Sequence, residues 1–135
     1  MYKIKKSASF CYGHRLMDHK GRCRNLHGHN GRVEVTLAAE KLDERMMVAD
    51  FGDLSEALKG WLDANLDHKT VLCARDPLLA VLKAQGQDCF VTEQNPTAEL
   101  LAGIILAELK KLGFPAVKVK FWETDTSVAC YSEKK

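Results

Sequence analysis

Three histidines in the first thirty residues have the types and spacing that metal chemistry requires. His27 and His29 lie two residues apart, and residues two apart in a β-strand point to the same side of the sheet. His14 would end the preceding strand and approach this pair if the two strands pair antiparallel. Three neutral imidazoles suit a catalytic zinc ion and leave a fourth position for substrate or water. The spacing therefore predicts a zinc site formed by His14, His27 and His29.

Other interpretations of this cluster stay open. Imidazole ligands also suit nickel and copper, and the three histidines could be unrelated side chains. A closed structural zinc site would use Cys11 or Cys23 as its fourth ligand. Against Cys11, its position and that of His14 are odd and even in one strand, so their side chains would point apart.

A thiol and an adjacent Asp–His pair could supply acid–base chemistry. Cys23 lies in the basic segment 20–24, where positive side chains favour the thiolate form. Asp67 directly precedes His68, and a carboxylate that orients a histidine can help it to activate a thiol. Both features also have plain structural interpretations, as a half-buried thiol and as a helix end followed by a surface histidine.

Glu123 continues the alternation of apolar residues along 117–121 and should share their face of the strand. Because an unpaired buried charge is costly, this carboxylate requires an arginine or the N–H groups of a ligand. Glu99 falls in the first turn of a predicted helix, where the helix dipole favours negative charge. Glu123 is therefore the stronger candidate for ligand binding.

The composition is that of one globular domain spanning residues 1–135. A net charge of +2 is too mild to indicate a nucleic acid or membrane partner. No apolar run reaches the roughly 18 residues of a membrane span, and the charged N-terminus lacks the apolar segment of a signal peptide. Five cysteines, an odd number, favour a reduced, cytoplasmic setting.

The elements that must position these residues follow from hydrophobic periodicity. Alternation predicts four strands, over residues 2–14, 27–39, 116–124 and 127–132. Helical spacing predicts helices over 53–66 and 96–112, the first capped by Asp50 or Asp53 and the second by Asn95 with Pro96 in its first turn. This order favours an α+β fold, with an antiparallel sheet and helices on one face. Residues 67–95 have no clear pattern except a possible short strand within 88–93.

Six motifs, taken in order, resemble the family of 6-pyruvoyltetrahydropterin and 6-carboxytetrahydropterin synthases. They run over nearly the whole chain: Phe10…His14-Arg15-Leu16, Cys23-x-x-x-His27-Gly28-His29-Asn30, Val48-x-Asp50-Phe51, Leu66-Asp67-His68, Pro96-Thr97-Ala98-Glu99 and Glu123-Thr124. The resemblance implies the tunnelling fold, with a four-stranded antiparallel sheet and two helices on one face. It also implies an oligomeric barrel, usually a hexamer, with active sites between subunits.

The resemblance implies a role for each candidate residue. The zinc ligands would be His14, His27 and His29; Cys23 would be the catalytic base; Asp67 with His68 would tune it; and Glu123 would anchor the pterin. The implied substrate is 7,8-dihydroneopterin triphosphate, whose triphosphate could contact Lys20, Arg22 or Arg24. The short gap between Cys23 and His27 is similar to that of the bacterial enzymes that form 6-carboxytetrahydropterin, acetaldehyde and triphosphate on the way to queuosine and other deazapurines.

Departures from the family pattern leave the substrate side chain open. Cys11-Tyr12-Gly13 stands where small residues are usual, and Gly31 stands where an aromatic residue is common. The alternatives are a pyruvoyl or hydroxymethyl product, a non-catalytic zinc- and pterin-binding protein, and a structural zinc module that would unfold without metal. Retention of Cys23 together with the Asp–His pair favours an enzyme.

Overall fold

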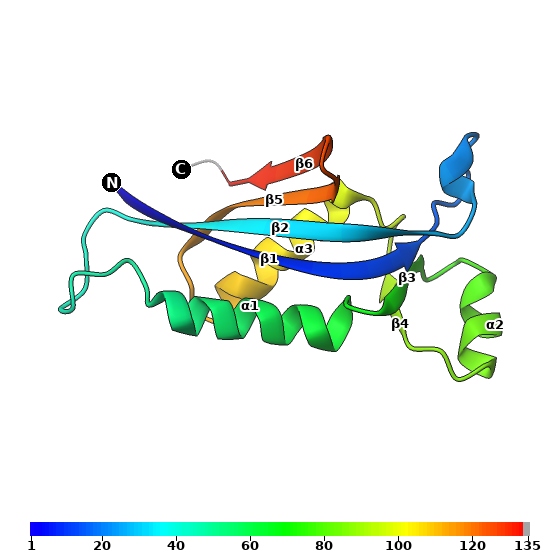
Figure 1. The fold of residues 1–135 in the computed structure, drawn as a ribbon, viewed down its shortest axis with the longest axis horizontal. Coiled ribbons are helices and arrows are strands. Elements are labelled where there is room, and N and C mark those ends of the chain that lie inside the picture. Colours follow the sequence, from blue (N-terminus) through cyan, green and yellow to red (C-terminus); the bar gives the residue numbers. More distant parts are fainter. Residues whose placement is uncertain (134–135) are drawn as a thin grey trace.

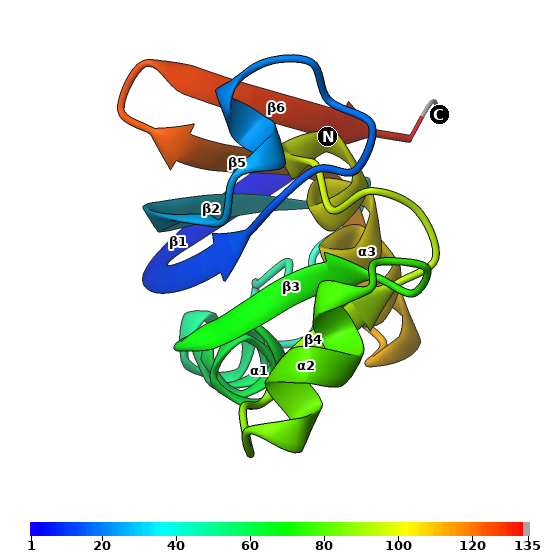
Figure 2. The same ribbon diagram turned by 90° about the vertical axis from the view of Figure 1, so that its right-hand side faces the viewer.

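A curved six-stranded sheet with helices packed against it makes up the computed structural model, which describes residues 1–133 (Figures 1 and 2). The strand order is β4-β3-β1-β2-β5-β6. The strands are β1 (Tyr2–His14), β2 (His27–Ala39), β3 (Lys69–Cys73), β4 (Cys89–Thr92), β5 (Ala116–Thr124) and β6 (Ser127–Ser132). The helices are the short 3-10 turn η1 (Arg22–Arg24), α1 (Phe51–Asn65), α2 (Leu78–Ala84) and α3 (Ala98–Lys111). Within the described chain, none of the helices has the length and apolar character to cross a membrane.

The α+β class and the four expected strands are confirmed. The expected sheet of four strands with two helices was wrong, because the described chain has a six-stranded sheet and three α-helices. β3 pairs parallel with β1, β4 pairs parallel with β3, and α2 lies between them in the chain. β4 falls inside the possible strand 88–93. β3 was missed because a strand of five residues whose last three are all buried has no alternation to detect.

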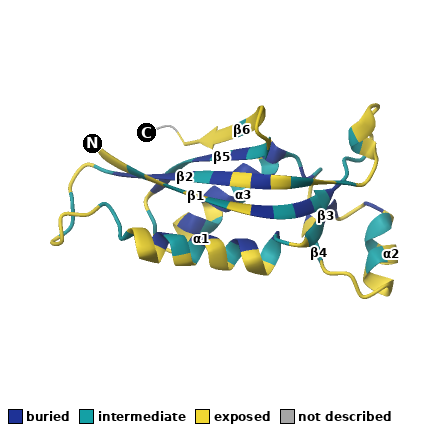
Figure 3. Cartoon of the chain, in the orientation of Figure 1, coloured by how far each residue is buried: buried dark blue, intermediate teal, exposed yellow. Residues whose placement is uncertain are grey.

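The hairpin of β1 and β2 forms the centre of the sheet and supplies much of the core. The two strands pair antiparallel without interruption from Tyr2–Ala39 to His14–His27. Buried residues recur along β2 and β5 and on α1 and α3, whereas α2 has none and β6 is largely exposed (Figure 3). One apolar layer joins the inner face of the sheet to α1 and α3, with buried side chains including Val33, Val35, Leu54, Leu58, Leu101, Ile105 and Phe121.

The helix caps confirm one expectation and correct another. Asp50 caps α1, because its side chain accepts a hydrogen bond from Asp53 N. Thr97, and not Asn95, caps α3 by accepting from Leu100 N at 3.1 Å. The Asn95 side chain is engaged elsewhere, since it bonds both the N–H and the carbonyl of Met17.

At Gly31 the backbone of β2 lies close to two aromatic rings of β1, and a stability measurement can test this packing. A Cβ at this buried position would lie 3.0 Å from Phe10 Cζ and 3.1 Å from Tyr12 Cε1. Both rings are themselves packed against Phe121 and cannot move freely. We therefore expect Gly31→Ala to lower the free energy of unfolding by roughly 1 kcal/mol or more, as overpacking does, in urea denaturation.

Gly60, in α1, is the matched control. Its Cβ would meet no atom within 4 Å, and alanine is preferred over glycine in a helix interior by roughly 0.5–1 kcal/mol. Gly60→Ala should therefore raise the free energy of unfolding. Equal effects of the two substitutions would contradict the tight packing over Gly31.

Candidate metal centre and active site

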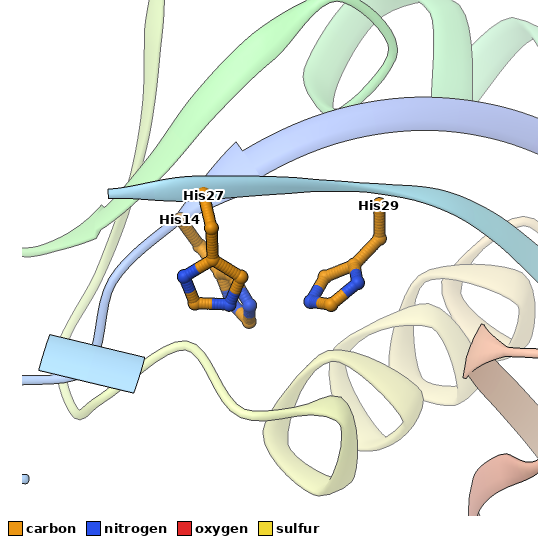
Figure 4. A group of neighbouring side chains, drawn as sticks. All are labelled: His14, His27 and His29. Atoms are coloured by element: carbon orange, nitrogen blue, oxygen red, sulfur yellow. The ribbon is translucent and has the colours of Figure 1, made fainter. Parts of the chain in front are cut away.

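The pairing of β1 with β2 brings the three predicted metal ligands together at one end of the hairpin. His14 is the register partner of His27, and His27 and His29 project from the same side of β2 (Figure 4). The ring centroids are 4.6 Å apart for His14 and His27, 5.1 Å for His14 and His29, and 4.9 Å for His27 and His29. One ligand atom from each ring lies within 4.8 Å of the others, which is close enough for a shared metal ion.

Two backbone carbonyls fix which ring nitrogen is free to bind a metal. His14 Nδ1 lies 2.8 Å from the carbonyl of Pro96, and His27 Nδ1 lies 2.7 Å from the carbonyl of Asn25. A carbonyl only accepts, so each Nδ1 carries the proton and each Nε2 keeps its lone pair. This is the usual support of metal-binding histidines.

Burial disfavours the charged forms of His14 and His29 and leaves one nitrogen of each ring without a partner. Burial, aided by the neighbouring histidines, lowers the pKa of His14 to about 4, although its bond to Pro96 opposes this. Burial also lowers the pKa of His29, against the opposing charge of Glu123. Nε2 of both rings is buried and has no hydrogen-bond partner among residues 1–133. Unpartnered lone pairs in a buried cluster fit a metal ion better than they fit a plain core.

Cys23 and Glu123 lie at the same end of the hairpin as the histidines. They line one cavity, together with Arg22, Asn25, His27 and His29. Glu123 Oε2 is 3.4 Å from His29 Nε2, an ion-pair distance without hydrogen-bond geometry. Glu123 also shares a second cavity with Glu99, at the start of α3. A carboxylate, a thiol and two of the three imidazoles therefore line one cavity.

Asp67 and His68 lie elsewhere in the chain's fold. They follow α1 and contact Cys11, whose side chain points to the opposite face of β1 from Tyr12 and His14. His68 Nδ1 is 3.0 Å from Asp67 Oδ2. The backbone N–H of Cys11, more than the adjacent imidazole, lowers the pKa of the Asp67 carboxyl. In the chain described here, the structure thus separates the predicted Asp–His pair from the cavity of Cys23.

Two residues beside the site were missed in the sequence. The side chain of Asp76 is fully buried and accepts a hydrogen bond from Arg15 Nε at 2.8 Å and a second from Arg15 Nη2. These bonds hold the pKa of Asp76 below its usual range and fix the chain just after His14. Tyr12 packs its ring 5.1 Å from that of His14, and its buried hydroxyl has no partner in the described part of the chain. Asp76 falls in the segment without a pattern, and no feature of the sequence pointed to it.

Comparisons with known proteins agree on one family. The profile of the 6-pyruvoyl tetrahydropterin synthase family matches residues 3–134. A protein of Rickettsia bellii named 6-carboxy-5,6,7,8-tetrahydropterin synthase is 38% identical over 104 residues, which are 76% of this chain and 75% of that protein. An uncharacterized protein from Wolinella succinogenes has a TM-score of 0.81 at 27% identity, with 98% of each chain covered. The 6-pyruvoyl tetrahydropterin synthase of Caenorhabditis elegans has a TM-score of 0.72 at 26% identity, covering 98% of this chain and 96% of that one.

The low pKa of buried His14 predicts how the metal-free protein responds to acid. Because this pKa is about 4 in the folded state and about 6.5 in the unfolded chain, only the unfolded chain binds the proton between these pH values. Stability should therefore fall as the pH drops through that window, by up to about 1.4 kcal/mol per pH unit for this group. Urea unfolding of the metal-free protein at pH 7 and pH 5 measures the loss.

His14→Asn is the matched variant, since its amide can still donate to Pro96 but does not titrate. We expect a smaller loss of stability between pH 7 and pH 5 than in the parent chain. His19→Asn, at an exposed position, should leave the loss unchanged. An unaltered pH dependence in His14→Asn would show that this imidazole is not held neutral by burial.

Proposed function

The chain belongs to the 6-pyruvoyl tetrahydropterin synthase family, and on this premise we propose that it is a zinc-dependent 6-carboxy-5,6,7,8-tetrahydropterin synthase. The proposed reaction converts 7,8-dihydroneopterin triphosphate to 6-carboxytetrahydropterin, acetaldehyde and triphosphate, a step toward deazapurines such as queuosine. The observation that carries the proposal is one cavity lined by two histidines of the cluster, a thiol and a carboxylate: His27, His29, Cys23 and Glu123. The proposed setting is the cytoplasm, where this thiol stays reduced.

The three histidines would hold the zinc ion. Their imidazoles, two of which are oriented by backbone carbonyls, would supply three nitrogen ligands and leave an open position. When bound, zinc would act as a Lewis acid that makes the hydroxyl groups of the substrate side chain more acidic. The chain's own contribution is to keep the ligand set rigid and its lone pairs free of competing hydrogen bonds.

Glu123 would fix the substrate's orientation. A carboxylate can accept two parallel hydrogen bonds from the amino and ring N–H groups at the edge of a pterin. Its position beside His29 would set the pterin next to the metal ligands. Arg22 lines the same cavity, and Lys20 and Arg24 belong to the same loop, so we propose that this basic segment contacts the triphosphate.

Cys23 would remove the proton from the substrate side chain. Its loop is closed by a hydrogen bond from Leu16 N to the carbonyl of Cys23, 2.8 Å long, which ties the thiol to the end of β1. A positioned base of this kind contributes typically 10²- to 10⁴-fold to a rate. The thiol lies in the cavity that His27, His29 and Glu123 line, within reach of a substrate held there.

Asp67 and His68 would act on the Cys23 of another copy of the chain. Within one chain the pair contacts Cys11, on the face of β1 away from His14. We therefore propose that the active site is completed between subunits of a homo-oligomer, a hexamer by family resemblance, so that each site combines one copy's cavity with a neighbour's Asp–His pair.

The first test is product analysis. The reduced, zinc-loaded protein is incubated with 7,8-dihydroneopterin triphosphate, and the pterin and the carbon fragment are identified by mass spectrometry. Acetaldehyde with 6-carboxytetrahydropterin is expected. A pyruvoyl or hydroxymethyl pterin would keep the site and change the reaction, and binding without turnover would favour a pterin-binding protein.

Cys23→Ala tests the proposed base. It should remain folded and zinc-loaded but lose turnover by roughly 100-fold or more, as expected when a positioned base is removed. The control is Cys130→Ala, because Cys130 is exposed on β6, outside the cavity that Cys23 lines. Full activity of Cys23→Ala would remove Cys23 from the mechanism.

Mixing two inactive variants tests the shared site. Cys23→Ala and His68→Ala chains, dissociated and reassembled together, should recover activity, since some sites then combine a native Cys23 with a neighbour's native His68. If equal amounts of the two chains assemble at random, about a quarter of the sites would contain both native residues. No recovery in assemblies that demonstrably contain both chains would mean that Cys23 and His68 of the same copy act together.

A further inference from the structure

A second group of metal-ligating side chains lies on the other face of β1, away from the three histidines. It consists of Cys11, Asp67 and His68, whose ligand atoms all lie within 4.8 Å of one another. Cys11 Sγ is 3.7 Å from Asp67 Oδ1 and 3.7 Å from each ring nitrogen of His68. The proposed reaction assigns no role to Cys11.

The backbone holds these three residues as one unit. Cys11 N donates to Asp67 Oδ1 at 3.0 Å, and His68 N donates to the carbonyl of Cys11 at 2.7 Å. His68 has a φ of 60°, a left-handed conformation that non-glycine residues rarely adopt and that persists only where surrounding contacts impose it. The segment after α1 is thus clamped so that a carboxylate and an imidazole face one thiol.

We propose that Cys11, Asp67 and His68 form a second site for a divalent transition-metal ion of the zinc class. Zinc bonds of about 2.3 Å to sulfur and about 2.0–2.2 Å to nitrogen or oxygen separate tetrahedral ligand atoms by roughly 3.3–3.7 Å. The distances of 3.7 Å from Cys11 Sγ to Asp67 Oδ1 and to the His68 nitrogens lie at the upper end of this range. The 3.0 Å contact joins His68 to the other oxygen of Asp67, Oδ2, and would give way to the ion. Thiolate, imidazole and carboxylate are all zinc ligands, and a thiolate disfavours magnesium and calcium.

The thiol of Cys11 and the imidazole of His68 lie close together but are not aligned as an acid–base pair. Cys11 Sγ is equidistant from the two ring nitrogens of His68, so neither nitrogen points at the sulfur as a base would. The imidazole side chain is 79% exposed, whereas the carboxylate of Asp67 is 27% exposed. The exposed imidazole therefore has room, within its own chain, to turn one nitrogen toward an ion.

This site would regulate the reaction, a consequence that rests on the proposed function. An ion held by Asp67 and His68 occupies the lone pairs with which the pair would assist Cys23. Excess zinc should therefore inhibit turnover in the parent chain and inhibit it much less in Cys11→Ser, which keeps every residue assigned to catalysis.

Cobalt(II) binding tests the site without using the reaction. The metal-free, reduced protein is titrated with Co²⁺ while its absorption spectrum is recorded, because a thiolate ligand adds an intense near-ultraviolet charge-transfer band that histidine ligands lack. We expect each chain to bind two equivalents of Co²⁺, of which only one gives rise to the thiolate band. Cys11→Ser should lose that band and one equivalent, Cys23→Ser should keep both, and His29→Ala should lose the other equivalent and keep the band.

One equivalent only, or a band that survives in Cys11→Ser and disappears in Cys23→Ser, would overturn the second site. Circular dichroism of each variant establishes that lost binding is not lost folding. If Cys11→Ser does not fold, His68→Ala gives the same readout, because it removes a second ligand from an exposed position. If the cobalt spectra are as expected but the protein shows no turnover, the proposed function is rejected and the second metal site stands.

Discussion

The register between β1 and β2 is the constraint on which the site depends. Side chains alternate between the faces of a strand, so a slip of β2 by one residue would carry His27 and His29 to the face of the sheet opposite His14. The uninterrupted pairing that sets His14 opposite His27 is held by the core, because the same faces of the two strands also carry Phe10, Val33 and Val35. Ordinary hydrophobic burial therefore sets the geometry of the histidine cluster.

The segment before α3 adds the second constraint, because three consecutive residues there each perform a different task. Asn95 bonds the backbone of Met17 in the loop after β1, Pro96 offers its carbonyl to His14, and Thr97 caps the helix. The hydrogen bond between His14 and Pro96 joins residues 82 positions apart in the chain. The tautomer of His14, a candidate metal ligand, is thus fixed by the same short segment that starts the helix.

The sequence predicted what depends on periodicity and missed what depends on long-range packing. The strands 2–14 and 27–39 were found at their observed bounds, and with them the histidine cluster, since alternation is a local property. β3 and the ion pair of Arg15 with Asp76 were not found, because a short buried strand and a single buried carboxylate leave no repeating pattern. Strand alternation excluded Cys11 from the histidine cluster, but its contact with Asp67 follows from a parallel pairing that no local pattern encodes.

The two faces of β1 separate the candidate groups of the chain, and on the proposed mechanism this separation would give assembly a direct role in catalysis. Tyr12 and His14 point toward the core and the metal cluster, while Cys11 points toward Asp67 and His68. Within one chain, Asp67 and His68 contact Cys11 and do not line the cavity of Cys23. On the proposed mechanism, the contacts that hold two copies together must also hold the Asp–His pair of one copy within proton-transfer distance of Cys23 of the other. Substitutions at that contact would then change turnover and association together, even where they touch neither the histidines nor the thiol.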